Sequence, residues 1–316
     1  MRGIHAWSSA LALALAVACG GSGHNPAAAP APAVPTPPAS AVAQFVSGLN
    51  LDEPVPGLLV VVDGATLAQP TAPDGRTAAT VPNGARVTTS GRTGFLDRDT
   101  RFSVQAPRLP LWPLTATHGA EYVRAIVYDY AGGEEASTQW DYLMRPRPAT
   151  YTVAVDATLR NDAVAYHWVN VALAEVMRIT HGQVTFSWVE TGGDVTFEVS
   201  PDYPGLEDSR GLCDQRFGGR FITGARIVLR SLATARSNTA VHELGHFLGL
   251  QHSSDLRDVM SVTHRNYQQV EFTSGEESAW LMMAQREPGN LFPDRDAALA
   301  GAAGRPSPPP IVCGRW

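Results

Sequence analysis

Short apolar runs rich in β-branched and aromatic residues alternate with turn residues from about residue 44 to residue 148. The runs lie at 58–63, 85–90, 101–105 and 121–130. Turn signals such as Pro73-Asp74-Gly75 and Pro82-Asn83-Gly84 separate them. This alternation is typical of antiparallel strands joined by tight turns. It predicts a small, sandwich-like all-β domain over residues 44–148, whose role the pattern does not indicate.

The pattern changes near residue 149. Apolar residues over 156–180 recur at helical spacing, and a second helix is predicted over 239–248. Strands are predicted at 150–156, 184–190, 194–200 and 225–231. The polar stretch 201–220 is rich in Gly and Pro and is predicted to be a loop. A helix, several strands and a further helix in this order indicate an α+β domain over residues 149–316.

Capping signals mark the ends of two of these helices. Ser237 or Asn238 can cap the helix over 239–248, because a short polar side chain accepts a hydrogen bond from the first helical turn. A last helix is predicted after Thr273, with Ser274 and Glu277 as a capping box.

The first 43 residues do not have the pattern of a folded domain. Residues 1–18 combine Arg2 with a short apolar stretch, which is typical of a signal peptide and too short to span a membrane. Residues 19–43 are rich in Pro and Ala and read as an extended linker. Cys19 follows Ala-Val-Ala, which resembles a bacterial lipobox, although Ala16 stands where Leu is usual. We therefore expect Cys19 to be lipidated and the protein to be exported as a bacterial outer-membrane or cell-surface lipoprotein. Plain secretion is the alternative.

Cysteine usage fits export. The chain has three cysteines, Cys19, Cys213 and Cys313, and an odd number in an exported protein requires an explanation. Lipidation of Cys19 leaves Cys213 and Cys313 as one pair in an oxidising compartment. We expect a disulfide between them, which would close a loop of about 100 residues and contribute up to ~4–5 kcal/mol.

The charge balance limits the classes of partner. The formal net charge is −6, and the chain has 24 basic residues. A nucleic-acid binder would show a basic excess, so we expect no nucleic-acid partner. Membrane contact is expected only through the N-terminal lipid, and the folded part is expected to be a monomer. The acidic pairs Asp97/Asp99 and Glu134/Glu135 could hold calcium, but solvated loop carboxylates are far commoner, so calcium stays possible and unsupported.

Residues 241–252 read VHELGHFLGLQH and contain the chain's strongest chemical signal. On a helix, His242 and His246 lie four residues apart, so both side chains are on one face and can bind one zinc ion. Glu243 follows the first histidine and is long enough to reach a water on the metal as a general base. Gly249 can end the helix in a left-handed conformation and bring His252 round as a third ligand. The fourth position stays open, as a catalytic site requires.

The five fixed positions of this run match the H-E-x-x-H-x-x-G-x-x-H signature, so residues 150–287 resemble the metzincin metalloproteases. Those enzymes have a methionine-containing turn beneath the metal, and Met260 in Asp258-Val259-Met260-Ser261 is the analogue. Ser253 after the third histidine makes the matrixin branch the most similar. The resemblance implies a metzincin-like fold with one catalytic zinc, and Met260 as structural support. No histidine lies between His181 and His242, so a second, structural zinc is not expected.

The resemblance implies a zinc-dependent endopeptidase that acts on protein or peptide bonds, with Glu243 as the general base. Two alternatives from other classes stay open. The first is a non-catalytic zinc-containing surface or adhesion protein, which the intact Glu243 disfavours. The second is a zinc hydrolase that acts on a non-peptide bond.

Overall fold

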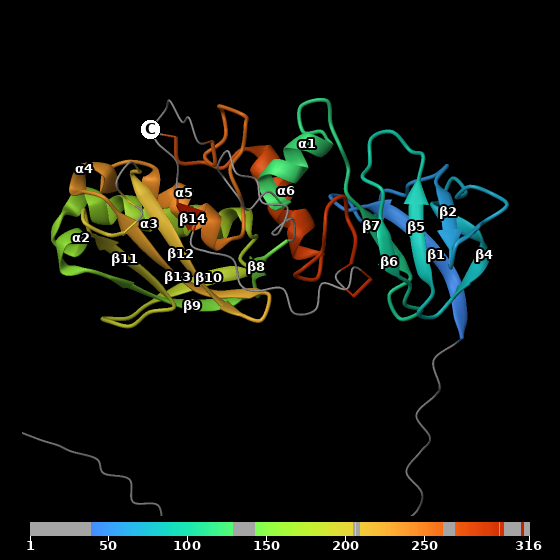
Figure 1. Cartoon of the computed structure of the whole chain (residues 1–316), viewed down its shortest axis with the longest axis horizontal. Helices are drawn as coiled ribbons and strands as arrows, with labels where there is room; N and C mark the ends of the chain where they lie inside the picture. The colour runs from blue at the N-terminus through green and yellow to red at the C-terminus, as the bar shows by residue number, and fades with distance from the viewer. Residues whose placement is uncertain are drawn as a thin grey trace, which may run out of the picture. The chain divides into compact units, whose positions relative to one another are not determined.

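The computed structural model describes residues 39–128, 143–204, 206, 209–261, 269–296 and 298–299, and the backbone of 311–312 (Figure 1). From Pro37 to the C-terminus the chain forms one compact unit. Both helices and strands contribute to it, so the predicted α+β class is confirmed. The predicted signal peptide, Cys19 and Cys313 lie outside the described residues.

Two small β-sheets make up the N-terminal part. The first contains β1 (Ser40–Ser47), β4 (Arg76–Pro82) and β7 (Arg108–Leu111) in the order β4-β1-β7. The second contains β2 (Leu59–Val62), β3 (Ala65–Thr66), β5 (Arg86–Ser90) and β6 (Asp99–Arg101) in the order β3-β2-β5-β6. One buried apolar cluster takes side chains from both sheets, including Phe45, Val60, Val81, Val87 and Leu111. The predicted all-β part is therefore present, and its first strand begins at Ser40, inside the stretch predicted to be linker.

One strand predicted in this part is wrong. Residues 120–128 form the short helix α1 (Ala120–Val123) and the π-helical turn η1 (Arg124–Tyr128). Tyr122, Val123, Ile126 and Val127 are all buried, and this spacing fits one face of a helix rather than the alternation of a strand. The β-branched and aromatic residues that indicated a strand fill a core instead.

A mixed sheet forms the scaffold of the C-terminal part. Its strands are β8 (Arg145–Pro146), β9 (Ala149–Val155), β10 (Val184–Trp188), β11 (Val195–Val199), β12 (Gly211–Gly218), β13 (Phe221–Leu229) and β14 (Ile311–Val312). The order is β10-β9-β11-β13-β12-β14, with β8 pairing in parallel with β13. β10, β9, β11 and β13 are parallel, whereas β12 is antiparallel to both β13 and β14. β12 therefore has a partner strand on each side.

The prediction of a loop over 201–220 is wrong for Gly211–Gly218, because this stretch forms β12 and pairs with β13 along its whole length. A polar residue occupies an inward position of this strand: Gln215 is buried and donates a hydrogen bond to the backbone oxygen of His246. Its polarity hid the alternation that would have indicated a strand.

Cys213 lies on β12 as a buried, free cysteine, so the predicted disulfide with Cys313 is not supported. The residue opposite Cys213 in β14 is Ile311. Burial raises the pKa of the thiol well above its usual value, and the charges of Glu243 and Asp214 add to the effect. The thiol therefore stays protonated, and it packs as part of the large apolar core.

The helices of this part are α2 (Ala157–Asn161), α3 (Ala163–Ile179), α4 (Leu232–Ala235), α5 (Thr239–Phe247) and α6 (Ser274–Ala284). The single helix predicted over 156–180 is two helices, because Asp156 caps α2 and Asp162 caps α3 through their side chains. The capping box of α6 is Thr273 with Glu276, one residue earlier than predicted. α3 and α5 pack against each other beside the sheet (Figure 1).

A large apolar core joins these helices and the sheet to residues that precede position 148. Trp112, Val127 and Leu143 belong to the same buried cluster as Phe197 and Leu244. The division of the chain at residue 148 stays a prediction, but the residues just before it share the core of the larger part.

A buried ion pair links the segment after α6 to Asp294, near the end of the described residues. Arg286 Nη2 lies 2.7 Å from Asp294 Oδ2, and both side chains are 0% exposed. Arg286 also donates to the backbone oxygen of Pro110, which lies within β7. Burial raises the pKa of Asp294, but Arg286 and Arg98 outweigh it and hold this pKa below its usual value. The carboxylate therefore remains charged in the core.

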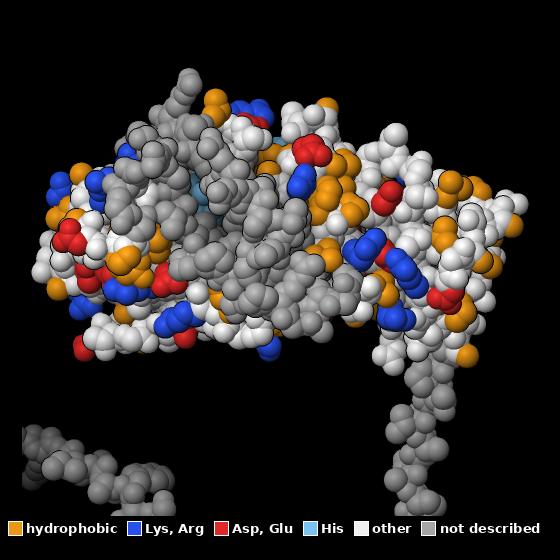
Figure 2. Space-filling view, in the orientation of Figure 1, with side chains coloured by type: hydrophobic (Ala, Val, Ile, Leu, Met, Phe, Trp, Pro, Cys, Tyr) orange, Lys and Arg blue, Asp and Glu red, His pale blue; other side chains and the backbone are white. Residues whose placement is uncertain are grey.

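Acidic and basic side chains are interspersed on the face drawn in Figure 2. Among the surface ion pairs of the described residues are Arg226 with Glu198 and Arg178 with Glu277. None of the helices in the described part of the chain has the length and apolar character needed to cross a membrane.

Candidate metal centre

Helix α5 presents two of the three candidate ligands. His242 and His246 are 3% and 0% exposed, and their ring centroids are 4.9 Å apart. His242 Nδ1 lies 2.7 Å from the backbone oxygen of Val259, and His246 Nδ1 lies 2.8 Å from that of Leu250. A carbonyl oxygen can only accept, so each Nδ1 carries the proton. Each Nε2 then has its lone pair available for a metal.

The third histidine approaches from the loop after the helix. Gly249 has φ +91°, and a Cβ at this position would collide with the backbone oxygen of Met144, so glycine is required there. The turn at Gly249 brings the ring centroid of His252 to 4.8 Å from that of His246 and 5.4 Å from that of His242. One ligand atom from each histidine lies within 4.8 Å of the others, a group that could hold a metal ion.

The environment keeps the imidazoles of His246 and His252 neutral. Burial, followed by the other two histidines, lowers the pKa of His246 well below its usual value. Burial, followed by His242, lowers the pKa of His252 to about 3. No described residue hydrogen-bonds to the buried Nε2 of His252. Neutral imidazoles with nitrogen lone pairs converging in a buried space are the donor set that zinc prefers, so these residues fit the ion.

Glu243 is fully buried beside the cluster. The strand β12 passes directly over it, because a Cβ at Gly211 would collide with Oε1 of Glu243 and with the side chain of Thr239. The sequence pattern did not reveal that Gly211 lies at the candidate site, since it fell in the predicted loop. Its lack of a side chain leaves the room that the carboxylate of Glu243 occupies.

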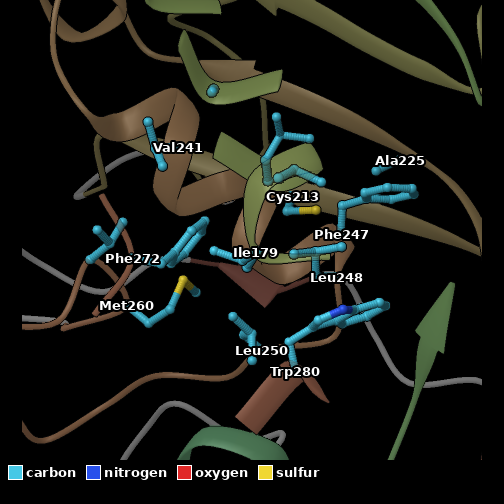
Figure 3. Packing of buried hydrophobic residues seen from close by; sticks show 14 of the residues in the cluster. Ile179, Cys213, Ala225, Val241, Phe247, Leu248, Leu250, Met260, Phe272 and Trp280 are labelled. Carbon is cyan, nitrogen blue, oxygen red and sulfur yellow. The ribbon is translucent and has the colours of Figure 1, made fainter. Parts of the chain in front are cut away.

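The turn around Met260 lies under α5. A Cβ at Gly245 would collide with Sδ of Met260, and it would lie 3.2 Å from a ring carbon of Phe272. Figure 3 shows Met260 and Phe272 in the same cluster of buried side chains. The backbone nitrogen of Met260 donates to Glu276 Oε1 at 2.7 Å. Helix α6 therefore holds the turn from below, and α5 covers it.

A buried polar network surrounds this turn, and the sequence pattern did not reveal it either. Asp258, 1% exposed, accepts hydrogen bonds from the hydroxyls of Tyr122, Ser253 and Thr273. Glu276 accepts from the backbone nitrogens of Met260 and Thr273. The single available signal was the polar run around Asp258, which gives no indication of a partner as distant as Tyr122.

The comparisons with known proteins agree with this arrangement. Residues 180–277 match the family model described as matrixin. The matched stretch contains α5, the three histidines, Glu243 and the Met260 turn, and it leaves out residues 39–128. No curated protein gives a significant match. The resemblance to the matrixin branch of the metzincins is confirmed, and the match supports a zinc metallopeptidase in general.

Proposed function

We propose that this chain, whose residues 180–277 match the matrixin family model, is a zinc-dependent endopeptidase that hydrolyses protein or peptide bonds. The observation that carries the proposal is the convergence of His242, His246 and His252 beside the buried Glu243. A histidine triad next to a carboxylate combines a metal site that has an open position with a general base.

In this proposal each residue has a defined role. His242, His246 and His252 hold the zinc ion, which when bound supplies Lewis acidity for a water and for the peptide carbonyl. Glu243 accepts the proton of the attacking water and later donates it to the leaving amine. Val259 and Leu250 fix the tautomers of His242 and His246 through their backbone oxygens. Met260 packs under α5 and supports the floor of the site.

Hydrolysis of casein by residues 39–316 tests the proposal. We expect cleavage by the zinc-loaded protein, loss of cleavage with a chelator, and recovery when zinc is restored. Glu243→Ala should bind zinc normally and lose cleavage by ~10²–10⁴-fold, the usual contribution of a general base. A folded, zinc-loaded wild type that cleaves neither casein nor a peptide library would contradict the proposal and favour a non-catalytic surface protein.

A matched set of small ester and amide substrates separates the remaining alternative. Faster turnover of a non-peptide bond than of any peptide would favour a different zinc hydrolase. We further propose that the enzyme acts outside the cytoplasm, anchored through Cys19, because residues 1–18 have the pattern of a signal peptide. Labelling with a palmitate analogue, compared in wild type and Cys19→Ser, tests the anchor.

A further inference from the structure

The loop that carries His252 has its own supports, because the ligand lies beyond the end of helix α5. Two of these supports come from α1 and η1, residues 120–128, which precede the matrixin match. The backbone nitrogen of Gln251 donates to the backbone oxygen of Ile126 at 2.7 Å. The hydroxyl of Tyr122 donates to Asp258 Oδ2 at 2.8 Å. A segment far away in the sequence thus contacts the loop on both sides of His252.

Asp258 links Tyr122 to the residue that follows the third ligand. Ser253 Oγ donates to the same oxygen of Asp258 at 2.6 Å, and the backbone nitrogen of Ser253 donates to the backbone oxygen of Met260 at 2.9 Å. The hydroxyl of Thr273 binds the other oxygen of Asp258 at 2.6 Å. The carboxylate is therefore held by three hydroxyls, and its position fixes that of Ser253.

Tyr122 is suited to act as a permanent donor in this network. It is 8% exposed. Burial, followed by the charge of Asp258 and its hydrogen bond, raises the pKa of the Tyr122 hydroxyl far above its usual value. The hydroxyl therefore keeps its proton at any working pH. A buried carboxylate that loses such a donor must reorient or recruit water, and the loop attached to it shifts with it.

We propose that Tyr122 is a positioning residue for the zinc site, which fixes the third ligand His252 through Asp258 and Ser253. The proposal rests on the proposed function, since it takes the three histidines as zinc ligands. It also gives residues 120–128 a function within the fold, because they complete the metal site.

The test compares Tyr122→Phe with Tyr128→Phe in residues 39–316. Tyr128 is a matched control, because it lies in the adjoining turn η1, is fully buried, and donates its hydroxyl to Asn290 Oδ1 at 2.7 Å. Each variant removes one buried hydroxyl. Zinc affinity is measured by competition with a chromophoric chelator, and ligand geometry is read from the visible spectrum of the cobalt-substituted protein.

We expect Tyr122→Phe to weaken zinc binding ~10–100-fold, the usual effect of losing a group that orients a ligand. Its cobalt spectrum should shift. Tyr128→Phe should keep wild-type zinc affinity and spectrum although it lowers the melting temperature. Wild-type affinity and spectrum in folded Tyr122→Phe would overturn the inference and leave the proposed function intact.

Two further measurements separate the possible failures. If Tyr122→Phe does not fold, Asp258→Asn interrupts the same link one residue nearer the ligand. Weakened zinc binding in that variant supports the inference, and unchanged binding overturns it. Tyr122→Phe and Asp258→Asn interrupt the same link, so their effects should not add. The double variant should therefore bind zinc as tightly as the weaker-binding of the two single variants. A wild type that binds no zinc would refute the proposed function, and the inference with it.

Discussion

Gly211 on strand β12 lies directly against the carboxylate of Glu243 on helix α5, so that a single added methyl would clash with Oε1. The two residues are 32 positions apart, and nothing in the spacing of the zinc-binding motif includes Gly211. The strand thereby sets the place of the proposed general base as firmly as the helix does.

Gly211→Ala should reduce kcat/KM sharply while zinc remains bound. The new Cβ must push Glu243 away from its present position or move β12 outward, and a displacement of about 1 Å can reduce a rate by roughly 10²-fold. Steady-state kinetics and metal content of the purified variant are the measurements. Gly119→Ala is the control, because a Cβ at Gly119 meets nothing within 4 Å. Unchanged kinetics in Gly211→Ala would show that Glu243 is not confined by the strand.

Removing the metal should lower the stability of the folded state. A ligand that binds only the native state stabilises it by about 2.7 kcal/mol when its free concentration is 100 times its Kd. We therefore expect the melting temperature to rise with free zinc and to fall with a chelator. In His246→Ala, which lacks a ligand from the last turn of α5, the same titration should leave the melting temperature almost unchanged. A zinc-dependent rise of wild-type size in that variant would place the metal elsewhere.

Stability should fall as the pH rises from about 4.5 toward 8, owing to Glu276. Burial, followed by the charge of Asp258, raises the pKa of Glu276 from its ordinary value near 4.5 to about 8. Between these values the folded protein retains a proton that the unfolded chain has released, so a higher pH favours unfolding. The urea midpoint of zinc-free protein at pH 5.5, 7.0 and 8.5 measures the effect. Glu276→Gln should show a weaker pH dependence, and parallel curves for the two proteins would exclude Glu276 as the source.

The buried pair of Arg286 and Asp294 should be costly to break from one side. Arg286→Met removes the nearer of two cations from Asp294, whose side chain is 0% exposed, and leaves it only the more distant Arg98 at 3.8 Å. Removing one partner of a buried pair costs about 3–5 kcal/mol, and Arg98 should keep the loss toward the lower end of that range. The free energy of unfolding in urea is the measurement. Replacing both partners, as Arg286→Met with Asp294→Leu, should restore part of the loss because the buried carboxylate is then removed together with its nearest cation, while Arg98 keeps its ion pair with Asp296. Arg257→Met removes an exposed ion pair with Asp255 and should have little effect.

The sequence was sufficient to find the three candidate metal ligands because they lie close together along the chain. His242 and His246 are one helical turn apart, and Gly249 determines the return of the chain to His252. Local geometry alone therefore placed three histidines around one point, and the structure has all three there. The parallel strands were predictable for a related reason, since their sequences carry the local pattern of a strand. In β11, for example, the buried Val195 and Phe197 alternate with the half-buried Thr196 and Glu198.

The surroundings of the site could not be predicted because they depend on contacts between distant residues. The run 121–130 has strand-like composition, yet residues 120–128 are helical because Tyr122 and Ile126 bind the loop of the third ligand. Gln215 is polar and still faces inward, because the end of α5 offers it a carbonyl oxygen. In both cases a tertiary partner outweighs local preference, and a single sequence gives no sign of that partner.

The hydrogen bond between Tyr122 and Asp258 spans 136 residues, and this span sets an order of events during folding. During synthesis, which proceeds from the N-terminus, α1 is made long before His252 and the turn around Met260. If Tyr122 positions the third ligand as proposed, full zinc affinity requires this large loop to close, so we expect metal binding to be a late step of folding. In a stopped-flow refolding experiment with a fluorescent zinc indicator, zinc uptake should follow the burial of Trp112 and Trp280 rather than precede it.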